Sequence, residues 1–167
     1  MFRMIALFLV GSFFVLTGQH FNKRMRKRIS SLKQLLVFIE NINSQISFSK
    51  MTIQEIIGSI TLKEEMKLKM IDELSRDENG DFQSAWRNSV NTYYSDDSLD
   101  KEDAKILLSF GNSLGVTDVA GQENNCRLHI SMLEKQLAAA ESNLKEKSKI
   151  NTALSTFLAL ASVIIFY

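Results

Sequence analysis

Apolar residues are concentrated at the start of the chain. Residues 4–16 are apolar apart from Gly11 and Ser12, and the only charge before residue 19 is Arg3. A helix of about 18 residues is about 27 Å long, which is close to the hydrocarbon thickness of a bilayer. A signal peptide is the alternative, but no small-x-small cleavage site follows and a dense basic cluster does. The pattern predicts an uncleaved transmembrane anchor over residues 1–20.

The C-terminal end of the chain is also apolar and uncharged. Residues 150–167 carry no charge, and Lys145, Lys147 and Lys149 stand immediately before them. A buried terminal helix of a soluble fold is the alternative to a second span. Basic flanks of an apolar helix favour the cytoplasmic side of a membrane, and here both flanks face the middle of the chain. The sequence therefore predicts a transmembrane helix over 150–167, with both termini outside and residues 21–149 forming a cytoplasmic domain.

The middle of the chain has the spacing of amphipathic helices. The first apolar stripe comprises Ile29, Leu32, Leu36, Ile39, Ile42 and Ile46. Because the chain has no Pro and no Gly between Gly18 and Gly58, this helix is expected to continue directly from the first span. The last stripe follows a heptad pattern and comprises Cys126, Ile130, Leu133, Leu137, Ala140 and Leu144. It covers less than about three heptads, which favours packing within a bundle over an intermolecular coiled coil.

Shorter helices are expected between these two stripes. Thr52 and Glu55 have the spacing of a capping box before a helix that ends near Ile60. Further helices are expected over 63–75, over 82–93 and from an Asp100 cap to Leu114, with a turn over 76–81 and a loop over 95–98. The predicted fold class is all-α: a cytoplasmic bundle of about six helices flanked by N- and C-terminal transmembrane helices.

Composition narrows the classes of function. The chain has 20 Lys and Arg against 19 Asp and Glu, a net charge of +1, which argues against a nucleic-acid binder driven by overall charge. A single Cys excludes an internal disulfide and a multi-cysteine zinc site. The chain contains no Gly-rich phosphate loop, no Gly-x-Ser-x-Gly elbow and no convergent set of acid, base and nucleophile. The sequence therefore predicts a protein that is not an enzyme and has no catalytic, cofactor or metal site.

Two polar groups allow both a functional and a structural interpretation. Cys126 and His129 could share a metal ion, but two ligands make a poor site, so a buried thiol beside a surface histidine is favoured. The acidic group comprises Asp96, Asp97, Asp100, Glu102 and Asp103. It lacks the glycine-centred spacing of a calcium loop, which favours a solvated loop and helix N-terminus. A docking surface for a partner is the alternative.

A basic cluster follows the first apolar segment. It comprises Lys23, Arg24, Arg26, Lys27 and Arg28. The favoured interpretation is a topological signal that is also attracted to anionic lipid head groups, at about 1 kcal/mol per charge. A nucleic-acid patch would need interleaved aromatic residues, which are absent. A protein-docking patch is left open.

The most distinctive local segment covers residues 109–122. Gly111 within a helix permits close backbone approach, and Gly115 can adopt the left-handed conformation that ends a helix. Thr117 or Asp118 can cap the next helix. The segment predicts a tight interhelical corner, on which a partner contact is the functional alternative. Its candidate residues are Gly111, Leu114, Gly115, Thr117, Asp118 and Gln122.

These features resemble the stage III sporulation protein AB family of endospore-forming bacteria over essentially the full length. The family's core segment reads leucine-glycine-x-x-leucine-glycine-x-serine-aspartate-x-x-x-glutamine. The matching residues here are Gly111, Leu114, Gly115, Asp118 and Gln122, whereas Phe110 and Thr117 replace the leucine and the serine. Ala85-Trp86 resembles the family's alanine–tryptophan pair, and Ile53 stands where the family usually has proline.

The resemblance implies a domain similar to the cytoplasmic domain of type II secretion and type IV pilus inner-membrane platform proteins. It implies a non-enzymatic platform in the mother-cell membrane, within the channel complex between mother cell and forespore. Expected partners are the membrane and other stage III sporulation proteins, notably the cytoplasmic ATPase (the AA member), which the chain would couple to membrane ring components. No nucleic acid is expected, and homo-oligomerisation is left open. The alternative is a membrane-anchored helical-bundle sensor or adaptor, which needs an internal apolar cavity.

Overall fold

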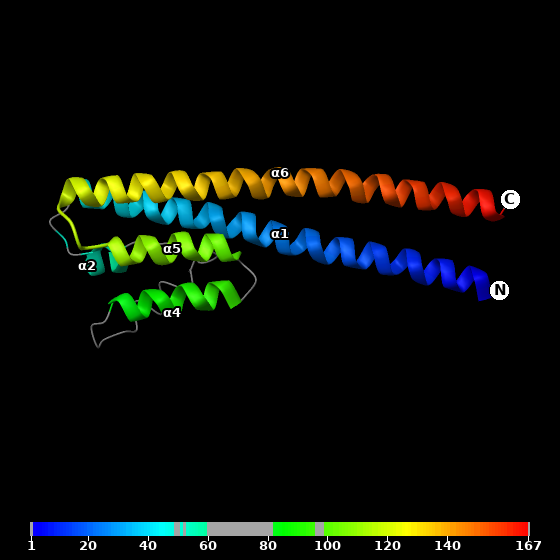
Figure 1. The fold of residues 1–167 in the computed structure, drawn as a ribbon, viewed down its shortest axis with the longest axis horizontal. Coiled ribbons are helices and arrows are strands. Elements are labelled where there is room, and N and C mark those ends of the chain that lie inside the picture. Colours follow the sequence, from blue (N-terminus) through cyan, green and yellow to red (C-terminus); the bar gives the residue numbers. More distant parts are fainter. Residues whose placement is uncertain (1, 49–50, 52, 60–81, 96–98, 167) are drawn as a thin grey trace.

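The structure is a computed structural model (Figure 1) that describes the backbone of all residues except 1, 49–50, 52, 60–81, 96–98 and 167. Within the helices, side chains are described except at 2–21, 54, 58–59, 93, 95, 151–152, 155–156 and 158–166. The described residues form five helices and contain no strand, which confirms the all-α class. The predicted helix over 63–75, the turn over 76–81, the capping Thr52 and most of the loop over 95–98 lie outside the described residues.

Two long helices form an antiparallel hairpin. Helix α1 runs from Phe2 to Phe48 and helix α6 from Val119 to Phe166. At 1.5 Å per residue each is about 70 Å long. The two lie side by side in opposite directions, so that both ends of the chain reach the same end of the molecule (Figure 1). The unbroken α1 confirms that the first apolar segment and the Ile29–Ile46 stripe belong to one helix.

The predicted membrane spans fall at the open end of this hairpin. In the part of the chain that the structure describes, no helix is long and apolar enough to cross a membrane. Most of the side chains in 1–20 and 150–167 lie outside that part. The two spans therefore stay predictions.

Three short helices pack against the hairpin near its closed end. They are α2 (Ile53–Ser59), α4 (Phe82–Ser95) and α5 (Lys101–Ser113). Helix α5 contacts both α4 and α6, and α2 contacts α1 (Figure 1). Asp100 caps α5 as predicted, because its carboxylate accepts the backbone N–H groups of Glu102 and Asp103, both at 2.9 Å.

The core follows the two apolar stripes read from the sequence. On α1, Leu32, Ile39 and Ile42 are fully buried. On α6, Cys126 and Leu133 are fully buried, and the seam continues through partly buried neighbours that pack on the same cluster. Complete burial of one such aliphatic side chain contributes about 1.5–3 kcal/mol, so these stripes are what hold the hairpin closed.

Trp86 is the largest side chain in the core and joins three helices. Its indole Nε1 donates a hydrogen bond to the backbone carbonyl of Leu107 at 2.8 Å. Its ring lies near Phe38 of α1, Phe82 of α4 and Phe110 of α5, with centroids 6.3, 5.9 and 5.7 Å away. One aromatic cluster therefore connects α4 to both α1 and α5.

Candidate functional site

The predicted interhelical corner is present between α5 and α6. Leu114 is buried and ends α5, and its backbone N–H donates to the carbonyl of Gly111 at 3.2 Å. Gly115 follows with a φ of 77°, in the left-handed region that L-residues with a side chain rarely occupy. Two residues that sequence reasoning placed at a helix stop thus form that stop.

Asp118 and Gln122 hold the start of α6 in place. The Asp118 carboxylate accepts the backbone N–H of Gly121 at 2.9 Å, which makes Asp118 rather than Thr117 the cap. The buried Gln122 side chain reaches back across the corner and donates to the Ser113 carbonyl at 3.2 Å and to Thr117 Oγ1 at 3.0 Å. The Asp118 carboxylate and the Gln122 amide nitrogen form their hydrogen bonds within the corner, which gives them a structural role.

Gly111 is the point of closest approach between α5 and the Trp86 indole. A Cβ placed on Gly111 would lie 2.6 Å from Trp86 Cγ and closer still to Cδ1 and Nε1. The Gly111 carbonyl also accepts a hydrogen bond from the Gln83 side chain at 3.0 Å. Glycine at this position allows α4 and α5 to approach closely, as the sequence predicted.

The corner exposes two large apolar side chains beside its exposed polar ones. Val116 and Val119 are 72% and 57% exposed on either side of Asp118. The end of α1 lies beside this corner, because Ser47 Oγ donates to Glu123 Oε1 at 2.6 Å. Phe48, which is 90% exposed, follows directly on Ser47, and the half-exposed Met51 lies three residues farther along the chain. We call Phe48, Met51, Val116 and Val119 the apolar tip; sequence reasoning did not single them out, because an exposed valine has no local pattern.

The basic cluster divides into two kinds of residue. Lys23, Arg24, Arg26 and Lys27 are exposed on α1. Arg28 instead turns inward: its Nε donates to Asp103 Oδ2 at 2.7 Å, and its Nη2 donates to Asp103 Oδ1 at 2.9 Å. Arg28 Nη2 also lies 2.7 Å from Asp100 Oδ2 and donates to Gln136 Oε1 at 3.0 Å. Arg28 therefore ties α1 to α5 and α6.

This network corrects two predictions. The acidic group was expected to be solvated, yet Asp103 is fully buried, because its carboxylate accepts Arg28 and the Asp100 backbone N–H together. Arg28 was expected to be a membrane-flanking charge, yet its hydrogen bonds to Asp103 raise its pKa and fix it as a half-buried cation within the domain. No local signal could reveal the pair, since 75 positions separate the two residues.

Cys126 and His129 have structural environments. Both are buried, which confirms the buried thiol and corrects the expectation of a surface histidine. His129 is enclosed because its ring packs against Phe110, with centroids 5.3 Å apart, and its Nδ1 lies 2.9 Å from the Asn125 carbonyl. Burial, assisted by the Glu123 carboxylate, raises the pKa of the Cys126 thiol to about 11. Among the described residues, no group of three or more His, Cys, Asp or Glu could hold a metal ion.

The described residues thus define an all-α protein in which a long antiparallel helix pair carries a small helical domain at one end. The chain matches the family model of stage III sporulation protein AB over residues 3–167. It belongs to that family, whose name assigns it a role in sporulation.

Two individual proteins illustrate this relationship. The chain is 21% identical to stage III sporulation protein AB of Bacillus subtilis (strain 168), over 94% of this chain and 97% of that protein. A solved structure of a stage III sporulation protein AB is similar with a TM-score of 0.55 and 22% identity, covering 71% of this chain and 97% of the other. The structural likeness shows the fold.

Proposed function

We propose that this chain is a non-enzymatic membrane platform of the channel complex between mother cell and forespore. Both ends of the hairpin enter the mother-cell membrane, and the helical domain stands in the cytoplasm. There it engages the cytoplasmic ATPase of the same complex and couples it to the membrane ring components. This role is what membership of the family and the geometry below support.

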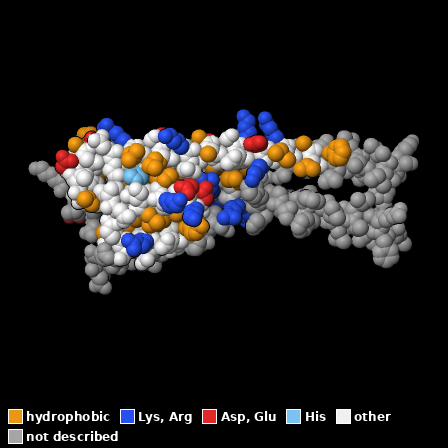
Figure 2. Space-filling model, in the orientation of Figure 1, with side chains coloured by type: hydrophobic (Ala, Val, Ile, Leu, Met, Phe, Trp, Pro, Cys, Tyr) orange, Lys and Arg blue, Asp and Glu red, His pale blue; other side chains and the backbone are white. Residues whose placement is uncertain are grey.

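The arrangement of the hairpin is the observation that carries the proposal. Residues 2–20 and 150–166 extend from the same end of the helix pair (Figure 1), so one membrane can receive both. The basic residues that border these segments lie at the same position along the axis of the helix pair, because Arg26 of α1 and Lys145 of α6 line one groove. Figure 2 shows Lys and Arg side chains gathered near the grey end of α1, and on α6 apolar side chains follow them toward the grey end. Basic residues are enriched on the cytoplasmic side of transmembrane helices, and here both helices carry them at the same position along the axis.

The apolar tip supplies the surface for the partner. It lies at the closed end of the hairpin, opposite the proposed membrane segments. A group of exposed apolar side chains at the far end of a small domain is typical of a protein–protein contact. The corner that carries Val116 and Val119 is held by the Asp118 cap and by the Gln122 bonds, so a hydrogen-bonded backbone presents these two side chains to a partner.

Binding between the full chain in detergent and the purified ATPase tests the coupling. Saturable binding is expected, and Val116→Glu with Val119→Glu is expected to weaken it about thirtyfold, the effect of losing an apolar anchor worth about 2 kcal/mol. Leu128→Glu is the matched control, because Leu128 is 59% exposed but lies farther along α6. Absence of binding by a folded chain, or equal loss in the control, would contradict coupling through the tip.

A further inference from the structure

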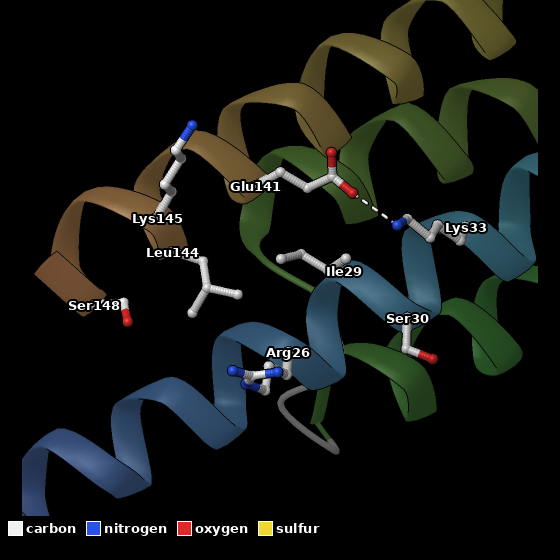
Figure 3. Close-up of a pocket in the computed structure, with 8 residues that line it drawn as sticks. All are labelled: Arg26, Ile29, Ser30, Lys33, Glu141, Leu144, Lys145 and Ser148. Atoms are coloured by element: carbon white, nitrogen blue, oxygen red, sulfur yellow. Dashed lines mark ion pairs between the residues drawn. The ribbon is translucent and has the colours of Figure 1, made fainter.

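An open groove of about 600 Å³ lies between α1 and α6, just inside the proposed membrane segments (Figure 3). Ile29 and Leu144 extend from the two helices toward each other and form an apolar floor (Figure 3). An ion pair between Lys33 and Glu141, 2.7 Å long, closes the end nearer the domain. The groove therefore has an apolar bottom, a closed inner end and an outer end toward the open side of the hairpin.

The charge on the walls of this groove is positive. Arg26 lines it from α1 and Lys145 from α6. Among the described residues, neither forms an ion pair, and the one carboxylate of the lining, Glu141, is already neutralised by Lys33. Hydroxyl groups of Ser30 and Ser148 also belong to the lining. Figure 3 shows Arg26 and Lys145 on opposite helices, with the Lys145 side chain directed away from Leu144 and Ile29. Both side chains are long and rotatable, so two cations that turn toward an apolar floor are complementary to an amphiphile with an anionic head.

We propose that this groove binds the phosphate head group of one anionic phospholipid from the membrane in which the hairpin is anchored. Arg26 and Lys145 contact the phosphate, and Ile29 with Leu144 contacts the glycerol and the first acyl carbons. This assignment rests on the proposed function, because the lipid reaches the groove only if the two ends of the hairpin enter the bilayer. Such a lipid would bridge α1 and α6 where they leave the membrane.

The test is a titration of the full chain in non-ionic detergent with phosphatidylglycerol, followed by native mass spectrometry. Saturable binding of one lipid per chain is expected. Arg26→Gln with Lys145→Gln is expected to weaken binding by about tenfold or more, since each charge near a lipid surface contributes appreciably to affinity. Lys23→Gln with Lys149→Gln removes the same charge outside the groove and is expected to change affinity less than about twofold. Arg26→Lys, which keeps the charge, is expected to retain binding.

Several results would overturn the groove site. If Arg26→Gln with Lys145→Gln and Lys23→Gln with Lys149→Gln weakened lipid binding equally, the lipid would be attracted to the basic surface as a whole. Equal affinity for zwitterionic phosphatidylethanolamine would exclude charge recognition, and competition by inorganic phosphate at similar concentration would show a site for the free ion. Fractionation of expressing cells distinguishes failure of the groove site from failure of the proposed function. If the chain stays in the membrane fraction but shows no saturable lipid binding, only the groove site is refuted. A chain absent from the membrane fraction contradicts the proposed anchoring.

Discussion

The Arg28 guanidinium on α1 forms two parallel hydrogen bonds with the fully buried carboxylate of Asp103 on α5, at 2.7 and 2.9 Å. The same carboxylate completes the capping box of α5 by accepting the Asp100 backbone N–H at 3.0 Å. One buried anion therefore couples the start of α5 to the hairpin. The short helices are fixed on α1 at the side that faces the proposed membrane.

Loss of the buried ion pair should be strongly destabilising. Asp103→Asn leaves a half-buried guanidinium without its main counter-charge, so we expect unfolding in urea to become easier by about 3 kcal/mol. The double variant Arg28→Met with Asp103→Leu should lose less free energy of unfolding than the two single variants lose in sum. The exposed pair Lys105–Glu102 on the same helix is the control, and Lys105→Gln should cost less than about 0.5 kcal/mol. Similar losses at both pairs would refute the role given to Asp103.

Gly111→Ala should disturb the aromatic cluster. The added methyl would collide with the Trp86 indole, so we expect a destabilisation of about 1–3 kcal/mol by overpacking. Trp86 is the only tryptophan of the chain, so a shift in tryptophan emission shows that the environment of this indole has changed. Ser109→Ala, at an exposed position of the same helix, should leave both the stability and the emission unchanged. An unaltered spectrum in Gly111→Ala would contradict the close approach.

Gly115→Ala tests the left-handed helix stop. A side chain at a φ of 77° is strained, with an expected cost of about 1–2 kcal/mol in thermal or urea unfolding. Gly115→Asn should cost less, because Asn tolerates this conformation better than Ala. Space is available at this position, since the nearest side-chain atom to an added Cβ would be Ile53 Cγ1 at 3.9 Å. If the two variants were equally stable, backbone strain would not explain the glycine.

Asp118→Ala should loosen the start of α6. Removal of the acceptor for the Gly121 N–H is expected to cost about 1 kcal/mol, whereas Asp118→Asn keeps an acceptor and should lose only a fraction of that. Hydrogen exchange measured by mass spectrometry over residues 116–126 should show faster exchange in Asp118→Ala alone. Unchanged exchange in that variant would mean that the Gln122 bonds suffice to hold the corner.

Cys126 predicts a decline of stability at alkaline pH. Its pKa in the folded chain is about 11, above the ordinary value of 9.0, so the folded state holds the thiol proton more tightly. The thiol's contribution to stability is therefore complete below pH 9 and is lost as the pH rises from 9 toward 11. Wild type should lose about 1 kcal/mol more than Cys126→Val between pH 8 and pH 10. Parallel pH profiles for the two proteins would show that folding does not raise the pKa of this thiol.

Sequence pattern predicted the parts of the fold that depend on neighbouring residues. The α1 and α6 stripes, the Asp100 cap and the corner at Gly115 and Asp118 all follow from spacing or from backbone chemistry within a few positions. The pairing of Arg28 with Asp103 and the enclosure of His129 by Phe110 depend on which helices meet. Such contacts produce no periodic pattern in the sequence. The basic run was therefore interpreted as a membrane flank and the acidic run as a solvated loop and helix N-terminus.

The anchoring of both ends in one membrane is the central claim, and cysteine labelling tests it most directly. In a Cys126→Ala background, the chain has no other cysteine, so Val119→Cys and Phe2→Cys can each be probed alone. We predict that a membrane-impermeant maleimide labels Phe2→Cys in intact protoplasts but labels Val119→Cys only after permeabilisation. Labelling of Val119→Cys in intact protoplasts, or recovery of the chain outside the membrane fraction, would contradict the account.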